Sequence, residues 1–536
     1  MKKIPATFTI VFFLVLIAAA CTWFVPGGEY DRHGIAVENA DGTVDTREVV
    51  DGNSFHYVER NPQTWQVFTS FFNGFVDKAD IIVFILMVGG AFFILNDSHA
   101  IDVGVLTFLR RAQRLNRVKF FRKVGVENII MSLIMILFSL FGAIFGMSEE
   151  TIAFVVIFIP LAISMGYDSI TGLCLCYVAA HVGFAGAMLN PFTIGIAQGI
   201  AELPIFSGLE YRFFCWAILT VILMVFVLLY ARKVKRNPTC SPVYAIDSYW
   251  RDRARAQQDN PVAYHTPRAA WILYVLLCIV LVYLAVRMPF TTVSIGSGSG
   301  QLCLMPVWAG LFVVTGFFAL RKSVHFFILD ILLFTILYLV TGVLGYGWYV
   351  MEISALFLAM GILSGIANGG GADDISRLFL AGCKDILSAA LVVGLASGII
   401  FILRDGHIID TLLHGLTSSL AKAGEVASVG AMYAFQTALN LIMPSGSAKA
   451  ALTMPIMSQF ADLIEVSRQT TVLAFQFGDG FTNMITPTSG VLIGCLGVAK
   501  IPYATWLKWA WKFIVALIVL GFVLILPTLY MDLPGF

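Results

Sequence analysis

The chain contains 536 residues, of which 59% are hydrophobic and only 12% are charged. Soluble domains usually carry about 25% charged residues, and a soluble core cannot bury this much apolar surface, so the composition excludes an ordinary soluble protein. The formal net charge of +1 provides no overall field for nucleic acid, and we expect the partners to be a lipid bilayer and a small-molecule substrate.

The first predicted membrane span covers residues 8–25. Residues 18–21, Ala-Ala-Ala-Cys, resemble a lipoprotein cleavage site, but the apolar run continues through Trp23-Phe24-Val25, and we interpret it as an uncleaved helix. Residues 26–62 then carry eight acidic residues against three basic ones. This loop is predicted to lie outside, which places the N-terminus in the cytoplasm.

Two basic stretches orient the rest of the chain. Residues 110–123 hold seven basic residues and no acidic one, and residues 232–268 hold eight basic against three acidic. By the positive-inside rule, both stretches are predicted to face the cytoplasm. The chain is therefore expected to be a multi-pass protein of the bacterial inner membrane.

Two apolar arms, residues 126–145 and 151–164, flank an interruption at 146–150. A span at 79–96 must run inward and a span at 211–230 must also run inward to reach the second basic stretch. A segment at 168–201 must then run outward, so the two arms must enter and leave on one side. They are predicted to form a re-entrant hairpin, which is tolerated only inside protein or beside a water-filled cavity.

Four further spans, at 269–286, 302–320, 324–345 and 350–367, are predicted to form a scaffold. The glycine-rich stretches 296–300 and 369–371 are interpreted as turns. The sequence thus predicts these units: a first helix with its outer loop (1–78), a first repeat (79–231) with hairpin 126–166 and broken helix 168–201, a cytoplasmic loop (232–268), a scaffold (269–384) and a second repeat (385–530) with hairpin 427–464 and broken helix 469–499.

An internal repeat supports this division. Residues 92–102, FFILNDSHAID, recur as residues 400–410, IFILRDGHIID, with an offset of 308 at each aspartate and histidine. The span at 79–96 runs inward and its mate, at about 385–403, runs outward. The predicted fold is therefore an all-α polytopic membrane protein with two inverted repeats, an arrangement typical of alternating-access carriers.

The hairpin tips and helix breaks are the predicted binding site. Ser148 and Ser447 are expected to cap the second arm of each hairpin, and the free backbone N–H groups there suit a substrate carboxylate. The pairs Asn190-Pro191 and Thr486-Pro487 interrupt apolar runs, where proline frees a carbonyl that can hold a cation. A simple structural kink is the alternative interpretation of each pair.

Ionisable residues near these breaks are costly to desolvate and therefore mark functional sites. Glu149, Glu150 and Asp479 are candidates for binding a cationic group, and the alternative is an internal partner such as Lys449. For His181 the alternative is a buried neutral histidine with one hydrogen bond. Acidic side chains together with helix N-termini fit an amino acid, whereas a dicarboxylate would require more cationic groups.

The candidate substrate-binding residues are therefore Ser148, Glu149, Glu150, Thr151, Asn190, Ser445, Gly446, Ser447, Lys449, Asp479 and Asn483. The candidate residues for coupling to Na⁺ or H⁺ are Glu149, Asn190, Asp479, Thr486 and Thr488. We expect no cofactor, and no metal beyond a transported Na⁺. A membrane enzyme is a distant alternative, because neither a His-Glu-x-x-His nor a Gly-x-Ser-x-Gly motif is present.

The motifs at residues 145–150 (FGMSEE), 444–455 (PSGSAKAALTMP) and 471–480 (TVLAFQFGDG) resemble the YfcC-like branch of the C4-dicarboxylate anaerobic carrier family. The resemblance covers nearly the whole chain and implies a homodimer that moves a transport domain like an elevator. Similar proteins carry C4-dicarboxylates, basic amino acids or short-chain fatty acids. The chain departs from the pattern at Lys449, where an uncharged polar residue is expected, and it lacks the Ser-Asn-Thr tips of sodium-coupled carriers.

We therefore expect a secondary active transporter of a small charged metabolite, by basic amino acid exchange or ion-coupled uptake. The alternative is a C4-dicarboxylate or short-chain carboxylate carrier.

Overall fold

The computed structural model describes residues 7–38, 44–51, 54–104, 107, 125–204, 206–259, 263–295, 298–420 and 424–536. The predicted cytoplasmic stretch 110–123 lies outside the described residues. Within them, eight helices are long and apolar enough to cross a membrane, namely α3, α6, α11, α13, α14, α15, α16 and the α23–α24 segment. The protein is thus a multi-pass helical membrane protein, as its composition predicts.

The N-terminal helix α1 (Thr7–Phe24) is followed by short antiparallel strand pairs. Strand β1 (Gly28–Glu29) pairs with β4 (His56–Tyr57), and β2 (Arg32–Glu38) pairs with β3 (Val44–Val50). A third pair, β5 (Thr291–Ile295) and β6 (Gly298–Leu302), joins two helices. These short ribbons connect helices, and the chain is otherwise mainly helical, in agreement with the predicted all-α polytopic class.

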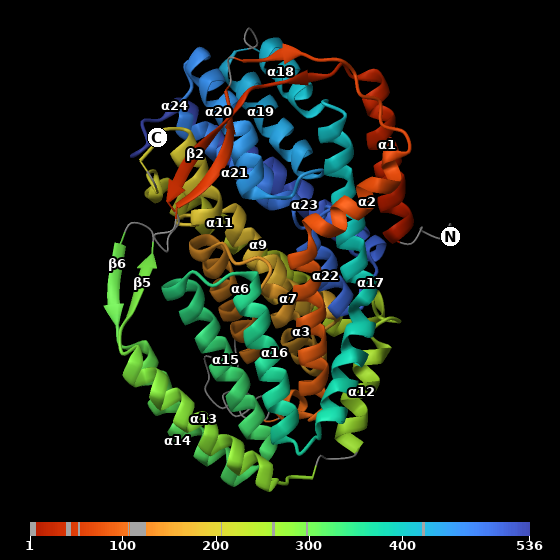
Figure 1. Ribbon diagram of the computed structural model, residues 1–536, viewed down its shortest axis with the longest axis vertical. Coiled ribbons are helices and arrows are strands. Elements are labelled where there is room, and N and C mark those ends of the chain that lie inside the picture. Colours follow the sequence, from red (N-terminus) through yellow and green to blue (C-terminus); the bar gives the residue numbers. More distant parts are fainter. Residues whose placement is uncertain are drawn as a thin grey trace.

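Six long helices lie at predicted spans: α3 (Ala79–Asp97), α11 (Leu209–Arg236), α13 (Arg268–Arg287), α14 (Leu304–Lys322), α15 (Val324–Tyr346) and α16 (Val350–Ala367). Helix α17 (Ala372–Asp405) begins well before the span predicted at about 385–403. The remaining helices are α2 (Gln66–Asp77), α18 (Ile409–Leu420), α23 (Tyr503–Ile525) and α24 (Pro527–Tyr530). The division placed at residues 384/385 falls inside α17, which packs along α2 and α3 (Figure 1). The 232–268 segment contains the unpredicted helices η3 (Pro238–Cys240) and α12 (Ser248–Asp259).

Two helical hairpins lie at the predicted positions. Helices α6 (Val126–Phe145) and α7 (Thr151–Ser164) have the predicted bounds of the first pair of arms, and α19 (Glu425–Asn440) with α20 (Gly446–Leu463) forms the second. Helix α6 is by itself long enough to cross a membrane, so helix length does not decide between a re-entrant and a crossing arm. The re-entrant arrangement therefore stays a prediction.

Each hairpin is followed by a helix that is broken as predicted. The first consists of α8 (Ser169–Leu173), η1 (Cys174–Val178) and α9 (Ala179–Ala185), then η2 (Pro191–Gly195) and α10 (Ile196–Ile200). The second consists of α21 (Arg468–Thr482) and α22 (Gly490–Ala499). The breaks coincide with the Asn190-Pro191 and Thr486-Pro487 pairs, because proline removes a backbone donor from the helical ladder.

The backbone has matching features in the two halves. A proline lies inside each second arm, Pro160 in α7 and Pro455 in α20. Left-handed residues follow these arms, Gly166 and Glu465, and residues His99 and His407 at the ends of α3 and α17 have φ angles of 55° and 54°. The order of these features is the same in both halves.

The first hairpin and the first broken helix pack through glycines. A Cβ atom on Gly142 of α6 would collide with the carbonyl oxygen of Ala180 in α9, and one on Gly183 of α9 would collide with that of Ser139 in α6. Gly480 of α21 lies against Ala185 in the same way. Only a hydrogen atom fits at these three positions, so the main chains of α6, α9 and α21 lie in direct contact.

Two buried carboxylates attach the 232–268 segment to the start of α8. Asp168 caps this helix by accepting from the Thr171 N–H at 2.9 Å, and its other oxygen accepts from the hydroxyl groups of Tyr230 and Ser241. Asp247 accepts from the Ser169 N–H at 2.9 Å. Among the described residues its second oxygen has no hydrogen-bond partner, and burial raises the pKa of Asp247 to about 6.

Exchange of Asp247 for asparagine should alter the pH dependence of stability. In the unfolded chain the pKa of Asp247 is about 4. Because folding raises this pKa, protonation of Asp247 adds up to about 3 kcal/mol to the free energy of unfolding. This contribution is complete below about pH 4 and is lost as the pH rises through about 6. The apparent melting temperature of the wild type should therefore fall more between these pH values than that of Asp247→Asn. Equal slopes, measured by tryptophan fluorescence in detergent, would contradict the assignment.

Candidate functional site

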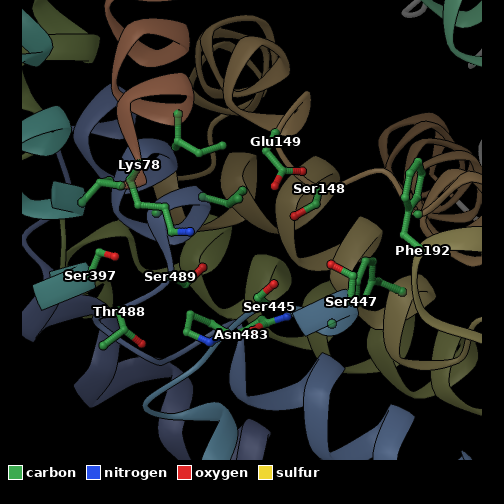
Figure 2. A pocket seen from close by; sticks show the side chains of 18 of the residues that line it. Lys78, Ser148, Glu149, Phe192, Ser397, Ser445, Ser447, Asn483, Thr488 and Ser489 are labelled. Carbon is green, nitrogen blue, oxygen red and sulfur yellow. The ribbon is translucent and has the colours of Figure 1, made fainter. Parts of the chain in front are cut away.

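The four predicted breaks meet around one cavity of about 220 Å³. This is the volume of roughly seven water molecules, which suits a small metabolite. Lys78 and Glu149 reach it from one side, and Asn483 and Thr488 reach it from the other (Figure 2). Its polar and charged lining consists of Lys78, Asp80, Ser148, Glu149, His181, Thr193, Tyr349, Ser397, Ser445, Ser447, Asn483, Thr488 and Ser489.

The first hairpin tip is held by two side chains that bind the main chain of Ser148, rather than by a serine cap. Helix α6 ends at left-handed Gly146, and α7 is preceded by Glu150, whose carboxylate accepts from the Ser148 N–H at 3.0 Å. The Thr151 hydroxyl donates to the Ser148 carbonyl at 2.5 Å. Within the described chain no side chain caps α7, so the prediction that Ser148 caps it is wrong, and the Ser148 hydroxyl faces the cavity instead.

The second tip differs from its prediction in a similar way. Helix α20 begins at Gly446, one residue before Ser447, which is therefore inside the helix and cannot be its cap. Ser445 is the residue before the helix, and for the described residues its side chain makes no capping bond either. The first N–H groups of α20 thus lie at the cavity without a side-chain cap, a position that favours an anionic group.

At the two helix breaks, three of the predicted side chains are engaged in holding the chain. The Asn190 side chain is buried and accepts from the Phe192 N–H at 2.9 Å. The hydroxyls of Thr486 and Thr488 both donate to the Leu441 carbonyl, at 2.7 and 2.9 Å. Asn190 and Thr486 do not line the cavity, whereas Thr488 does.

Lys449 and Asp479 form an ion pair with each other. The Lys449 ammonium lies 3.0 Å from an Asp479 carboxylate oxygen, and both side chains are fully buried. Neither residue lines the cavity. This geometry favours the alternative interpretation of Asp479, in which Lys449 is its internal partner.

Several lining residues were missed by the sequence analysis. Lys78 and Asp80 flank Ala79, the first residue of α3, at the start of the span predicted at 79–96. Tyr349 and Ser397 come from the end of the α15–α16 connection and from α17. The Lys78 ammonium lies 2.9 Å from Asp77, whose carboxylate also accepts from Ser397 at 3.0 Å. The signal that could have identified Lys78 and Asp80 is a lysine between two aspartates, Asp77 and Asp80, at the start of an apolar span.

His181 lines the cavity and also has a backbone partner. Its Nδ1 atom lies 3.0 Å from the Tyr177 carbonyl, which can only accept, so the neutral ring carries its proton on Nδ1. Its Nε2 atom lies 3.5 Å from the Ser148 hydroxyl. The unprotonated nitrogen is therefore directed toward the cavity.

These features define the class of protein: a multi-pass membrane transporter with a small polar cavity between broken helices. Residues 4–530 match the family model described as C4-dicarboxylate anaerobic carrier. The chain belongs to this family of secondary transporters.

Two relatives match along most of their length. YfcC of Escherichia coli (strain K12), provisionally named as a basic amino acid antiporter, is 31% identical over 94% of this chain and 92% of its own. An uncharacterized protein of Haemophilus influenzae is 24% identical over 97% of this chain and 96% of its own.

Two solved structures give weaker matches. The YdaH transporter of Alcanivorax borkumensis has 15% identity and a TM-score of 0.38, covering 97% of this chain and 98% of that one. MtrF of Neisseria gonorrhoeae has 16% identity and a TM-score of 0.38, covering 99% and 97%. Likeness at this level does not establish a shared fold.

Proposed function

We propose that the protein exchanges or takes up a small amino acid with a net positive charge, which binds in the cavity between the four breaks. The observation that carries the proposal is the charge of the lining. The lining contains one ammonium group, Lys78, which also pairs with Asp77 outside the lining, and two carboxylates, Asp80 and Glu149. A basic amino acid has the complementary set, one carboxylate and two cationic groups.

The substrate carboxylate would bind near Lys78 and the N-termini of α7 and α20. Lysine and free backbone N–H groups both stabilise an anion at a helix N-terminus. The two cationic groups would bind toward Asp80 and Glu149, with Ser148 and Asn483 as neutral hydrogen-bonding partners. The cavity is partly enclosed by protein, so these charges interact more strongly than they would in water.

A C4-dicarboxylate fits this lining less well. It would bring two negative charges to a cavity that has one lysine and two acidic residues. Lys449, the lysine predicted from the sequence as a candidate, is paired with Asp479 away from the cavity. The provisional name of the Escherichia coli relative points in the same direction.

A membrane enzyme is disfavoured by the same geometry. Ser148 and His181 lie 3.5 Å apart, like a nucleophile and its base, but such a pair also needs a third group that orients the base, an acidic side chain in the usual triad. The other ring nitrogen of His181 faces a backbone carbonyl. The proposal therefore assigns these residues to substrate binding.

Alternating access would use the two halves as inverted repeats. The matching prolines and left-handed residues support a common origin of the halves, and helices α13–α16 would supply the scaffold of a homodimer. The remainder, with both hairpins, would move as the transport domain in the bacterial inner membrane, with the N-terminus in the cytoplasm. Disulfide crosslinking of cysteines introduced into the two parts, followed by loss of transport, would test this motion.

Substrate identity is tested by counterflow into proteoliposomes. Liposomes loaded with unlabelled arginine or ornithine should accumulate labelled arginine faster than empty ones, whereas succinate and acetate should neither enter nor accelerate uptake. Liposomes without protein are the control. Uptake of succinate alone would overturn the proposed substrate class and would favour the dicarboxylate alternative.

A further inference from the structure

Lys449 lies in a fully enclosed site behind the second hairpin tip. Its Nζ atom is 3.0 Å from Asp479 Oδ1 and 3.2 Å from Asn440 Oδ1, and it lies over the ring of Phe475 at 5.0 Å. The Lys449 and Asp479 side chains have no exposed surface. A buried charge requires such a partner, because transfer from water costs several kcal/mol, but this does not explain why a charge is there.

The oxygen ligands of the ammonium come from the ends of two half-helices. Asn440 is the last residue of α19, and Asp479 lies in the last turn of α21. The C-terminal ends of helices carry partial negative charge, and carriers with broken helices hold their coupling cations at such ends. The ammonium therefore occupies the kind of position in which a monovalent cation would bind.

The site is connected to the cavity by one side chain. The Asn440 amide group, whose oxygen accepts from Lys449, donates to the Asp479 carbonyl at 2.7 Å and to the Asn483 side chain at 2.8 Å. Asn483 lines the cavity. A Cβ atom on Gly446 at the hairpin tip would lie 3.4 Å from Asp479 Oδ2, so the carboxylate stands directly behind the tip.

We propose that the Lys449 ammonium is a built-in replacement for a coupled monovalent cation, so that this site needs no Na⁺ for the transport cycle. The proposal rests on the proposed transport function. Among the described residues, neither carboxylate oxygen of Asp479 has a hydrogen-bond partner besides the ion pair with Lys449, and both oxygens would be available to a free cation if the lysine side chain were removed. Shortening Lys449 should therefore convert the site into one that binds an added cation.

The first experiment measures thermal unfolding of the purified full-length protein, and needs no transport substrate. The variants are Lys449→Ala, which leaves space, Lys449→Met, which fills it without charge, and Lys449→Ala combined with Asp479→Asn. Choline chloride is replaced stepwise by sodium or methylammonium chloride at constant ionic strength, up to about 100 mM, because a ligand that binds the folded state raises its stability.

Only Lys449→Ala should respond, with a rise of about 2 °C or more in its melting temperature. The wild type, Lys449→Met and the double variant should not. An equal response in all four proteins, no response in Lys449→Ala, or failure to obtain that variant folded in any of the three salts would overturn the proposal.

The second experiment measures exchange in proteoliposomes. The wild-type rate should be the same in sodium and choline media, and Lys449→Ala should exchange at least about tenfold faster in sodium or methylammonium than in choline. A sodium requirement in the wild type would overturn the replacement role. Absence of amino acid exchange together with a cation response in unfolding would contradict the proposed substrate and leave the cation site intact.

Discussion

Exchange of Glu149 for glutamine should lower the transport efficiency for a basic amino acid by about 30-fold or more. Glu149 faces the cavity at the first hairpin tip, and glutamine preserves its shape while removing the charge that would pair with a cationic group. Loss of one partner of a desolvated charge pair costs about 2 kcal/mol or more, which corresponds to this factor. Initial rates of labelled arginine counterflow over a range of concentrations measure the effect.

Glu202→Gln is the matched control. The Glu202 side chain is 80% exposed and pairs with Arg468 at the surface, so its exchange should leave the rate within about twofold. Thermal unfolding must show that Glu149→Gln is folded. Unchanged kinetics in a folded Glu149→Gln protein would remove Glu149 from the binding site.

Exchange of Lys78 for glutamine should weaken binding of the amino acid but not of the diamine that lacks its carboxylate. Lys78 is the ammonium group among the described lining residues, and its proposed partner is the substrate carboxylate. The Lys78 side chain is 37% exposed, so solvent screening reduces the effect and the affinity for the amino acid should fall about fivefold. The diamine should bind equally well or more tightly, because a positive charge has been removed from its site.

Isothermal titration of the purified protein with both ligands provides the comparison. Lys384→Gln, on an exposed position of α17, should leave both affinities unchanged. An equal loss for the amino acid and the diamine would show that Lys78 holds the cavity in shape, through Asp77 and Ser397, rather than the carboxylate.

The hairpin arms and helix breaks could be predicted from the sequence to within a few residues. Gly146 and Asn190-Pro191 interrupt long apolar runs, and such interruptions end helices whatever surrounds them. The positions of α6, α7 and α16 depend on local sequence alone, and these helices have the predicted bounds.

The composition of the site could be predicted only in part. Lys449 and Asp479 are predicted site residues because a charged group in a membrane carries a desolvation cost. An ion pair between two such groups offsets this cost as well as a substrate does. Whether the two residues meet depends on the packing of α20 against α21. Tyr349 and Ser397 carry no charge. Ser397 lies on α17, which packs along α2, α3 and α22, and Tyr349 directly precedes α16, which packs against α3. Local sequence contains no information on how these helices pack.

The glycine contacts between α6, α9 and α21 limit how substrate specificity can be redesigned. Gly142, Gly183 and Gly480 do not line the cavity, but they hold α6, α9 and α21 in main-chain contact, so these helices cannot move apart to widen the binding space that Gly146, His181 and Asn483 line. Tyr349 and Ser397 form a part of the wall that is made of side chains from outside these three helices. Directed evolution toward larger or differently charged solutes should therefore accumulate its substitutions on that wall.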